Sequence, residues 1–309
     1  METEQEGSEV MEVSFPELMH SAEKGNYAVG YFESWNLDSL LAVCDAAKKM
    51  KSPVIIGFGG IFLTHEKRVV KDNLNIFAAI AKKACRNLSV PACTIFNESN
   101  DFNAVLSSID LGYDLVMFVD STISTDELAN KVKKIVAKAH SSVVAVEAEI
   151  NELPGFSVLT GKVIESQLTN PETVKRFVSQ TGIDALSINI GQSHEPGKEV
   201  SLDFERLKEI RKATKVPLVL HGGSNLAPDE ISKAIDLGVR KFNLGGVLKK
   251  IYFDTLKKEI GNISDGYSYY EVVGSGFKED ILVKARLKVQ KVVEKYMQLY
   301  RSAGQADES

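Results

Sequence analysis

The stretch Val216–Ser224, with the sequence VPLVLHGGS, carries the pattern that decides the fold. Its apolar first part stops at His221 and is too short for a helix, so it predicts a buried strand that ends there. An imidazole at a strand end can bind a metal. The backbone N–H groups of the Gly222-Gly223-Ser224 turn can bind an anion such as phosphate. The other strand ends are therefore the places where partners of His221 are expected.

The same pattern, a short apolar run that ends in polar or glycine residues, occurs eight times. The runs are 27–32, 53–58, 90–96, 114–119, 143–150, 185–190, 217–220 and 240–244. Segments with helical spacing lie between them, such as 38–50 and 126–139, and Asn170-Pro171 and Ala227-Pro228 are helix-start signals. Eight strand–helix units predict parallel strands joined by crossover helices. In 309 residues they favour an α/β fold of the (β/α)8 TIM barrel type, with a doubly wound open sheet as the alternative.

No linker rich in proline, glycine or serine divides the chain, so we expect a single barrel domain over 1–309. Extra C-terminal helices in the segment 278–301 are expected to pack outside the barrel or to make a subunit contact. The polar termini, about 1–11 and 302–309, are expected to be frayed.

Composition narrows the class of protein. A formal net charge of -5 gives no basic footprint for nucleic acid. No apolar run approaches the roughly 20 residues of a membrane span, and the acidic N-terminus lacks the apolar core of a signal peptide. Three cysteines, Cys44, Cys85 and Cys93, make no disulfide framework. We therefore expect a cytoplasmic protein without nucleic-acid or membrane partners.

Chemistry in such a barrel gathers at the carboxyl ends of the strands. His194 and His221 follow two neighbouring strands, and with a carboxylate they would form a divalent-metal site, although each histidine alone could be structural. Glu147 and Glu149 lie two apart on one strand, so their side chains share a face. They could pair with a buried lysine or arginine, or supply a metal ligand and a carboxylate that orients a ligand.

The last two strands end in glycine-rich turns, where barrels often bind phosphate. These turns are Gly222-Gly223-Ser224 and Asn243-Leu244-Gly245-Gly246. Glycine also serves any tight turn, so the position at the strand ends carries the argument. Lys198, four residues after His194, could supply a cation to the same anion, or could be a solvated loop lysine.

These residues resemble the class II, metal-dependent fructose-bisphosphate aldolases, also called ketose-bisphosphate aldolases, over most of residues 26–250. The most specific stretch is Pro217–Ser224. The other matching stretches are Tyr27–Phe32 with Asn36, Val146–Glu149, Thr169–Glu172, Asp184–Leu186, Ile190–His194 and Lys241–Asn243.

The resemblance implies a (β/α)8 barrel, usually a homodimer or a higher homo-oligomer, with one catalytic Zn²⁺ or another divalent metal. In that family the metal polarises the carbonyl of dihydroxyacetone phosphate and stabilises the enediolate. His194 and His221 match metal ligands, and Glu149 and Asp120 match positions that bind metal in an alternative or second location. The resemblance and the strand ends give the substrate- or phosphate-binding candidates Asn36, Gly191, Lys198, Gly222, Gly223, Ser224, Asn243, Gly245 and Gly246.

At several positions the chain departs from the family pattern. Where the family has His-x-Asp-His after its third strand, this chain has Ile95-Phe96-Asn97-Glu98. Glu98 stands at the third histidine ligand and can still bind a metal, whereas the neutral amide of Asn97 cannot exchange a proton. The loop after Glu149 reads Ile150–Gly155, the segment after His194 reads Glu195–Lys198, and Gly246 replaces a phosphate-binding threonine.

Three functions follow from these residues. The first is a metal-dependent lyase acting on a phosphorylated ketose, with His194, His221 and Glu98 on the metal. In that enzyme Glu149, Asp120 or Glu152 would take over proton transfer, and Asn97 would only hydrogen-bond. The second is a metal-dependent isomerase or epimerase, which needs enediolate chemistry but no carbon–carbon cleavage. The third is a catalytically inactive homologue that binds a sugar phosphate or serves as a structural partner.

Overall fold

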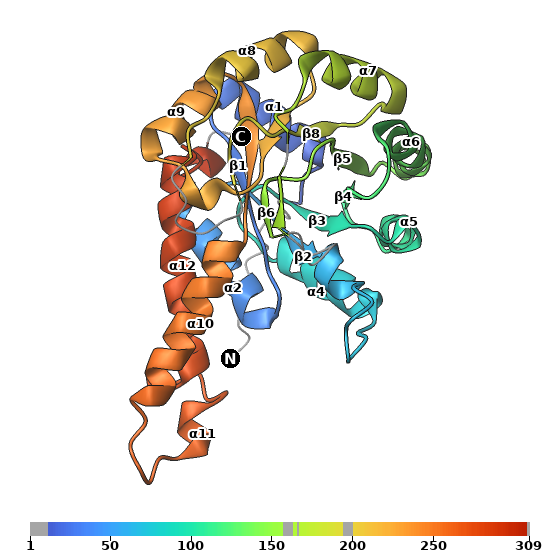
Figure 1. Cartoon of the computed structure of the whole chain (residues 1–309). Coiled ribbons are helices and arrows are strands. Elements are labelled where there is room, and N and C mark those ends of the chain that lie inside the picture. Colours follow the sequence, from blue (N-terminus) through green and yellow to red (C-terminus); the bar gives the residue numbers. More distant parts are fainter. Residues whose placement is uncertain (1–11, 157–162, 166, 194–199, 308–309) are drawn as a thin grey trace.

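The computed structural model describes residues 12–156, 163–165, 167–193 and 200–307. Its centre is a closed barrel of eight parallel strands in the order β1-β10-β9-β8-β5-β4-β3-β2 (Figure 1). The strands are β1 Val29–Phe32, β2 Val54–Gly59, β3 Ala92–Ser99, β4 Leu115–Phe118, β5 Ala145–Glu149, β8 Ala185–Ser187, β9 Leu218–Leu220 and β10 Val239–Leu244. Each predicted run contains or overlaps one of them. The TIM-barrel prediction is confirmed, and the open-sheet alternative is wrong because β1 pairs with both β2 and β10.

Helices form the outer layer around the barrel (Figure 1). They are α1 Phe15–Gly25, α2 Leu37–Met50, α3 Gly60–Leu63, α4 Leu74–Arg86, α5 Phe102–Asp110, α6 Thr125–Ser141, α7 Pro171–Thr181, α8 Phe204–Ala213, α9 Pro228–Asp236 and α10 Gly246–Gly261. Smaller elements are the antiparallel pair β6 Gly155–Phe156 and β7 Val163–Ile164, and the 3-10 turns η1 Gly223–Asn225 and η2 Gln305–Asp307.

The two helix-start signals act as predicted. The Asn170 side chain accepts hydrogen bonds from the N–H groups of Glu172 and Thr173, and Pro171 opens α7. At the start of α9, the Glu230 carboxylate accepts from the N–H of Ala227, 3.2 Å away. Both contacts satisfy N–H groups that a helix start would otherwise leave without a partner.

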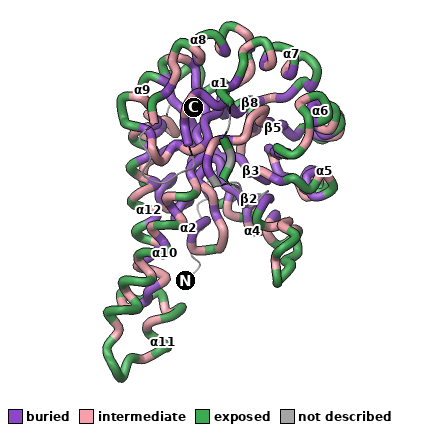
Figure 2. Tube along the Cα trace, viewed as in Figure 1, coloured by how far each residue is buried: buried purple, intermediate pink, exposed green. Residues whose placement is uncertain are grey.

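Two further helices, α11 Tyr269–Val272 and α12 Ile281–Leu299, follow α10. α10 and α12 run side by side along one flank of the barrel, and the chain around α11 extends beyond it with an exposed surface (Figures 1 and 2). After α12, Tyr300 stacks on Phe242 of β10 with ring centroids 4.5 Å apart. The segment predicted to pack outside the barrel does so.

Residues 302–307 are not frayed, contrary to the expectation. Ser302 is buried and its hydroxyl is 2.8 Å from that of Ser52. The N–H groups of Gly304 and Ala306 donate to the carbonyls of Met50 and Lys51. These bonds satisfy carbonyl groups at the end of α2, which a polar composition could not reveal.

The barrel interior is closed at one end. Phe15, Leu18, Met19 and Ala22 on one face of α1 pack against inward side chains near the starts of the strands, such as Ile55. Burying a side chain such as Leu18 contributes roughly 1.5–3 kcal/mol. α1 therefore plugs the amino-terminal mouth and leaves the carboxyl ends for the site. Among the described residues, none of the helices combines the length and the apolar content of a membrane span.

Candidate active site

A cavity of about 280 Å³ opens at the carboxyl ends of the strands. Its lining comes from loops and strand ends that lie far apart in sequence. The predicted residues that line it are Asn97, Glu98, Asp120, Glu149, Glu152, His221, Gly222, Gly223, Ser224, Asn243, Gly245 and Gly246.

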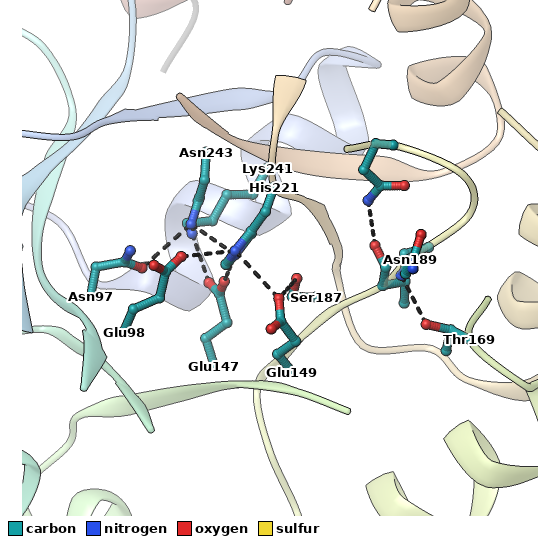
Figure 3. Close-up of polar contacts among 12 residues, drawn as sticks. Asn97, Glu98, Glu147, Glu149, Thr169, Ser187, Asn189, His221, Lys241 and Asn243 are labelled. Atoms are coloured by element: carbon teal, nitrogen blue, oxygen red, sulfur yellow. Dashed lines mark hydrogen bonds and ion pairs between the residues drawn. The ribbon is translucent and has the colours of Figure 1, made fainter. Parts of the chain in front are cut away.

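His221 lies at the centre of this group, directly after β9, and is 2% exposed. Its Nδ1 is 2.9 Å from Oε1 of Glu98 and 3.5 Å from Oε2 of Glu149 (Figure 3). Its Nε2 is 3.0 Å from Oε1 of Glu147. Burial opposes the charged form, but the hydrogen bonds to Glu147 and Glu98 raise the pKa of His221 to about 10.

Glu147 serves both roles that the sequence left open. It is fully buried, and its second carboxylate oxygen lies 2.7 Å from Nζ of Lys241, which is also fully buried. Burial raises the pKa of Glu147, but the Lys241 ammonium and His221 outweigh it and hold the pKa below its usual value. Glu147 therefore pairs with a buried lysine and orients His221 at the same time.

Lys241 was not predicted as a site residue. It precedes Asn243 by two positions on β10, so both side chains point into the barrel, and its ammonium donates to the Asn243 amide oxygen. Lysine is almost never fully buried unless it is paired, so a lysine on the inward face of a strand indicates a buried partner in the sequence.

Glu98 has an unusual backbone. Its φ of 47° is in the left-handed region, and the register of β3 against β4 shifts between Phe96 and Ser99. This irregularity aims the carboxylate of Glu98 at His221. Strained residues of this kind persist where the surroundings hold them, and they concentrate at functional sites. Next to Glu98, the buried side chain of Asn97 accepts a hydrogen bond of 3.4 Å from the Asn243 amide.

Three further carboxylates reach the cavity. Glu149 accepts a hydrogen bond of 3.1 Å from the Ser187 hydroxyl, and burial raises its pKa to about 7. Asp120 lines the cavity and accepts hydrogen bonds from the N–H and hydroxyl of Thr122. Glu152 lines the same side. The cavity lining around His221 is therefore rich in carboxylate oxygens that can bind a metal or accept a proton.

The glycine-rich turns line another part of the cavity. Gly222 has a φ of 68°, and an added Cβ would lie 3.1 Å from the Ser193 carbonyl oxygen, so this position requires glycine. An added Cβ at Gly246 would meet nothing within 4 Å, so the missing threonine leaves open space. Gly245 lies directly before α10, whose first N–H groups favour an anion.

Glu33 and Lys249 line the cavity but were not predicted as site residues from the sequence. Glu33 follows β1, and its Oε1 is 2.9 Å from Nζ of Lys249, one turn into α10. Lys249 Nζ lies 3.6 Å from the centre of the Phe62 ring. Burial raises the pKa of Glu33, and the Lys249 ammonium opposes that rise. The position of Glu33 at a strand end was the available signal.

Two predicted binding residues, Asn36 and Gly191, lie away from the described cavity lining. The Asn36 side chain caps α2 by accepting from the N–H of Ser39, 2.9 Å away. Gly191 makes a tight turn, where an added Cβ would lie 2.6 Å from the Ser201 carbonyl oxygen. Neither belongs to the described cavity lining. His194 and Lys198 lie outside the described residues.

The donors at the cavity suit a divalent metal by their chemistry. An imidazole nitrogen and carboxylate oxygens are ligands that zinc accepts, and Glu147 would fix the orientation of His221 from behind. Within the described ranges, however, no group of three or more histidine, cysteine, aspartate or glutamate side chains is arranged to hold a metal. The complete set predicted from the sequence includes His194.

Comparison with known proteins decides the family. The family described as "Fructose-bisphosphate aldolase class-II" matches residues 13–305. The chain belongs to the class II fructose-bisphosphate aldolase family. The sequence resemblance is thereby confirmed, and membership supports an aldolase-type lyase activity in general terms.

This class II aldolase family member shares only modest sequence identity with two of its relatives. It is 29% identical over 280 residues to the sulfofructosephosphate aldolase of Alkalicoccus urumqiensis, across 90% of this chain and 95% of the relative. It is 32% identical over 226 residues to YdjI of Escherichia coli K12, across 73% and 79% of the two chains. The crystal structure of the YdjI aldolase has a TM-score of 0.78, with 26% identity over 96% of this chain and all of that one. A putative fructose-1,6-bisphosphate aldolase from Coccidioides immitis has a TM-score of 0.81 at 24% identity, covering 96% and 99%, which supports the fold alone.

Proposed function

We propose that the protein is a metal-dependent lyase that cleaves a phosphorylated ketose through enediolate chemistry of the dihydroxyacetone-phosphate type. The observation that carries the proposal is the arrangement around His221. Its Nδ1 faces Glu98 and Glu149 at the cavity, while Glu147 holds Nε2 from the barrel interior. That arrangement leaves one imidazole nitrogen on the side of the cavity carboxylates.

His221, Glu98 and His194 would hold the metal, and Glu149 and Asp120 offer carboxylates for an alternative or second location. Zinc, or another divalent ion that accepts nitrogen and oxygen ligands, fits this set. When bound, such an ion supplies Lewis-acid polarisation of the substrate carbonyl. Glu147 keeps the His221 ring in one orientation, and apolar side chains of α1 fill the barrel interior below the site.

Proton exchange falls to a carboxylate other than that of the family pattern. Asn97 can only hydrogen-bond, and its partner is Asn243. Glu149 lies beside His221 with one oxygen held by Ser187, and Glu152 and Asp120 are further acceptors in the cavity. We assign the proton transfer to Glu149, with Glu152 as the other candidate on that wall.

The phosphate of the substrate is assigned to the turn of Gly222, Gly223 and Ser224, with Asn243 beside it. The name of one relative, a sulfofructosephosphate aldolase, supports a ketose phosphate. A homodimer or higher homo-oligomer and a cytoplasmic location belong to the same proposal.

A metal-dependent isomerase or epimerase is the second candidate, and the buried neutral amide of Asn97 favours it. Such a reaction needs no acid or base for carbon–carbon cleavage. Carbon–carbon cleavage separates the two candidates. Cleavage of a ketose phosphate to two products supports the lyase. Exchange of a carbon-bound proton with solvent, without cleavage of any ketose phosphate, supports the isomerase.

The test of the departure at the third strand end is the double change Asn97→Asp with Glu98→His. It restores the family pattern at both positions and is expected to create or increase cleavage of fructose 1,6-bisphosphate. Failure of a folded, metal-loaded double variant to cleave this sugar would show that the site has diverged beyond these two residues. Failure of the protein to bind zinc, manganese or cobalt would defeat both the lyase and the isomerase.

A further inference from the structure

Glu33 and Lys249 form a pair that is built into the cavity wall. An added Cβ at Gly59 would lie 2.5 Å from Oε1 of Glu33, and one at Gly245 would lie 2.3 Å from Oε2. The carboxylate therefore occupies a slot that exists because both flanking residues are glycines. Gly245, which we predicted as a phosphate-binding residue, thus also makes room for Glu33.

The pair has no net charge. The carboxylate and ammonium are 2.9 Å apart, and Glu33 is the only ion-pair partner of Lys249 in the part of the chain that the structure describes. A phosphate that approached Lys249 would also approach the carboxylate, and the two anions would repel each other. Phosphate oxygens accept hydrogen bonds, so a fully ionised phosphate could use the ammonium but not Glu33.

A hydroxyl group matches both members of the pair. It can donate its proton to the carboxylate of Glu33 and accept a hydrogen bond from the ammonium of Lys249. Lys249 has three donors, so its bond to Glu33 leaves donors for a ligand. Its side chain is 32% exposed and Glu33 is 15% exposed, which places both within reach of the cavity.

We infer that the Glu33–Lys249 pair determines substrate specificity by hydrogen bonding a hydroxyl group of the sugar, and that it does not bind the phosphate. The inference rests on the proposed function for its substrate class, and it adds which end of the cavity recognises the carbon chain. The phosphate stays with Gly222, Gly223 and Ser224. A substrate without a hydroxyl at this end would leave two charged groups without a ligand partner.

Binding to the full-length protein tests this inference without relying on catalysis. The probes are inorganic phosphate, erythritol 4-phosphate and n-butyl phosphate, titrated calorimetrically into wild type, Glu33→Gln and Lys249→Met. Wild type is expected to prefer the polyol ester over the butyl ester by about tenfold, the equivalent of about 1.4 kcal/mol. Both variants are expected to reduce that preference to about twofold or less, with inorganic phosphate binding unchanged.

Lys250→Met is the matched control, because it removes a charge from the same helix at an exposed residue paired with Asp254. It is expected to retain the wild-type preference. The inference is overturned if Lys249→Met lowers the affinity for inorganic phosphate by about tenfold. It is also overturned if both variants keep the preference for the polyol ester, or if wild type has no such preference. A preference for the polyol ester without cleavage of any ketose would overturn the proposed function but leave this inference standing. Cleavage of a ketose phosphate without that preference would overturn this inference but leave the proposed function standing.

Discussion

Oε1 of Glu147 lies 3.0 Å from Nε2 of His221, inside the barrel and away from the cavity. A carboxylate in this position favours a proton on Nε2 and holds the ring so that Nδ1 faces the cavity. The site is therefore supported by a fully buried group that does not belong to the described cavity lining.

Replacing this support is expected to impair the site while leaving its cavity residues in place. Glu147→Gln should lower metal affinity or turnover by about 10–100-fold, because the amide holds the imidazole less firmly. Competition with a chromogenic chelator measures the metal affinity, and unfolding by urea confirms that the variant is folded. A folded variant with wild-type metal affinity and turnover would contradict the role of Glu147.

Lys241 is expected to stabilise the fold through Glu147. Lys241→Met leaves the fully buried Glu147 without its cation, and the free energy of unfolding should fall by about 3–5 kcal/mol. The double variant Lys241→Met with Glu147→Gln removes both charges and should be more stable than the single variant. Urea unfolding measures all three proteins. Equal losses of unfolding free energy in the single and the double variant would contradict this prediction.

The alternation of strands and helices predicted the barrel, and the turn after His221 predicted one corner of the site. The partners of His221 across the barrel were harder to find. Glu147 and Lys241 are 94 residues apart by their numbers, and β8 and β9 lie between their strands, so only the curvature of the closed sheet brings the two side chains together in its interior. The pattern of residues along the chain does not predict the short distance between these two side chains in the folded barrel.

Local signals account for other differences. Asn36 was assigned to substrate because it follows the first strand, yet it begins α2 with Ser39 three residues later, which is the spacing of a reciprocal cap. The slot for Glu33 depends on Gly59 and Gly245, which meet only in the folded barrel.

The two glycines before and at the start of α10 should respond differently to alanine. Gly245→Ala forces the Glu33 carboxylate to move and should destabilise the protein by about 1–3 kcal/mol. Gly246→Ala meets open space at the first helical position and should stabilise by at most about 1 kcal/mol. Thermal unfolding distinguishes them, and Glu33→Ala should relieve the loss at Gly245. Equal effects at both glycines would rule out the slot.

Stability should also depend on pH through Glu12, which pairs with Lys82 and Arg86. Burial raises the pKa of Glu12, but these cations outweigh it and hold the pKa below its usual value of 4.5. A lowered folded pKa contributes stability above that value and loses it as the pH falls through the folded pKa. Glu12→Gln should therefore be less stable than wild type at pH 7, by at most about 1 kcal/mol because the pairs are partly exposed. The difference should shrink below about pH 4.5. A constant difference in urea unfolding from pH 7 to pH 4 would contradict this.

The proposed lyase activity is measured as triose phosphate released from a panel of phosphorylated ketoses by the metal-loaded protein. We expect dihydroxyacetone phosphate from at least one ketose, with release abolished by a chelator and by His221→Ala. Absence of triose phosphate from every ketose, with a divalent metal bound and the protein folded, would contradict it.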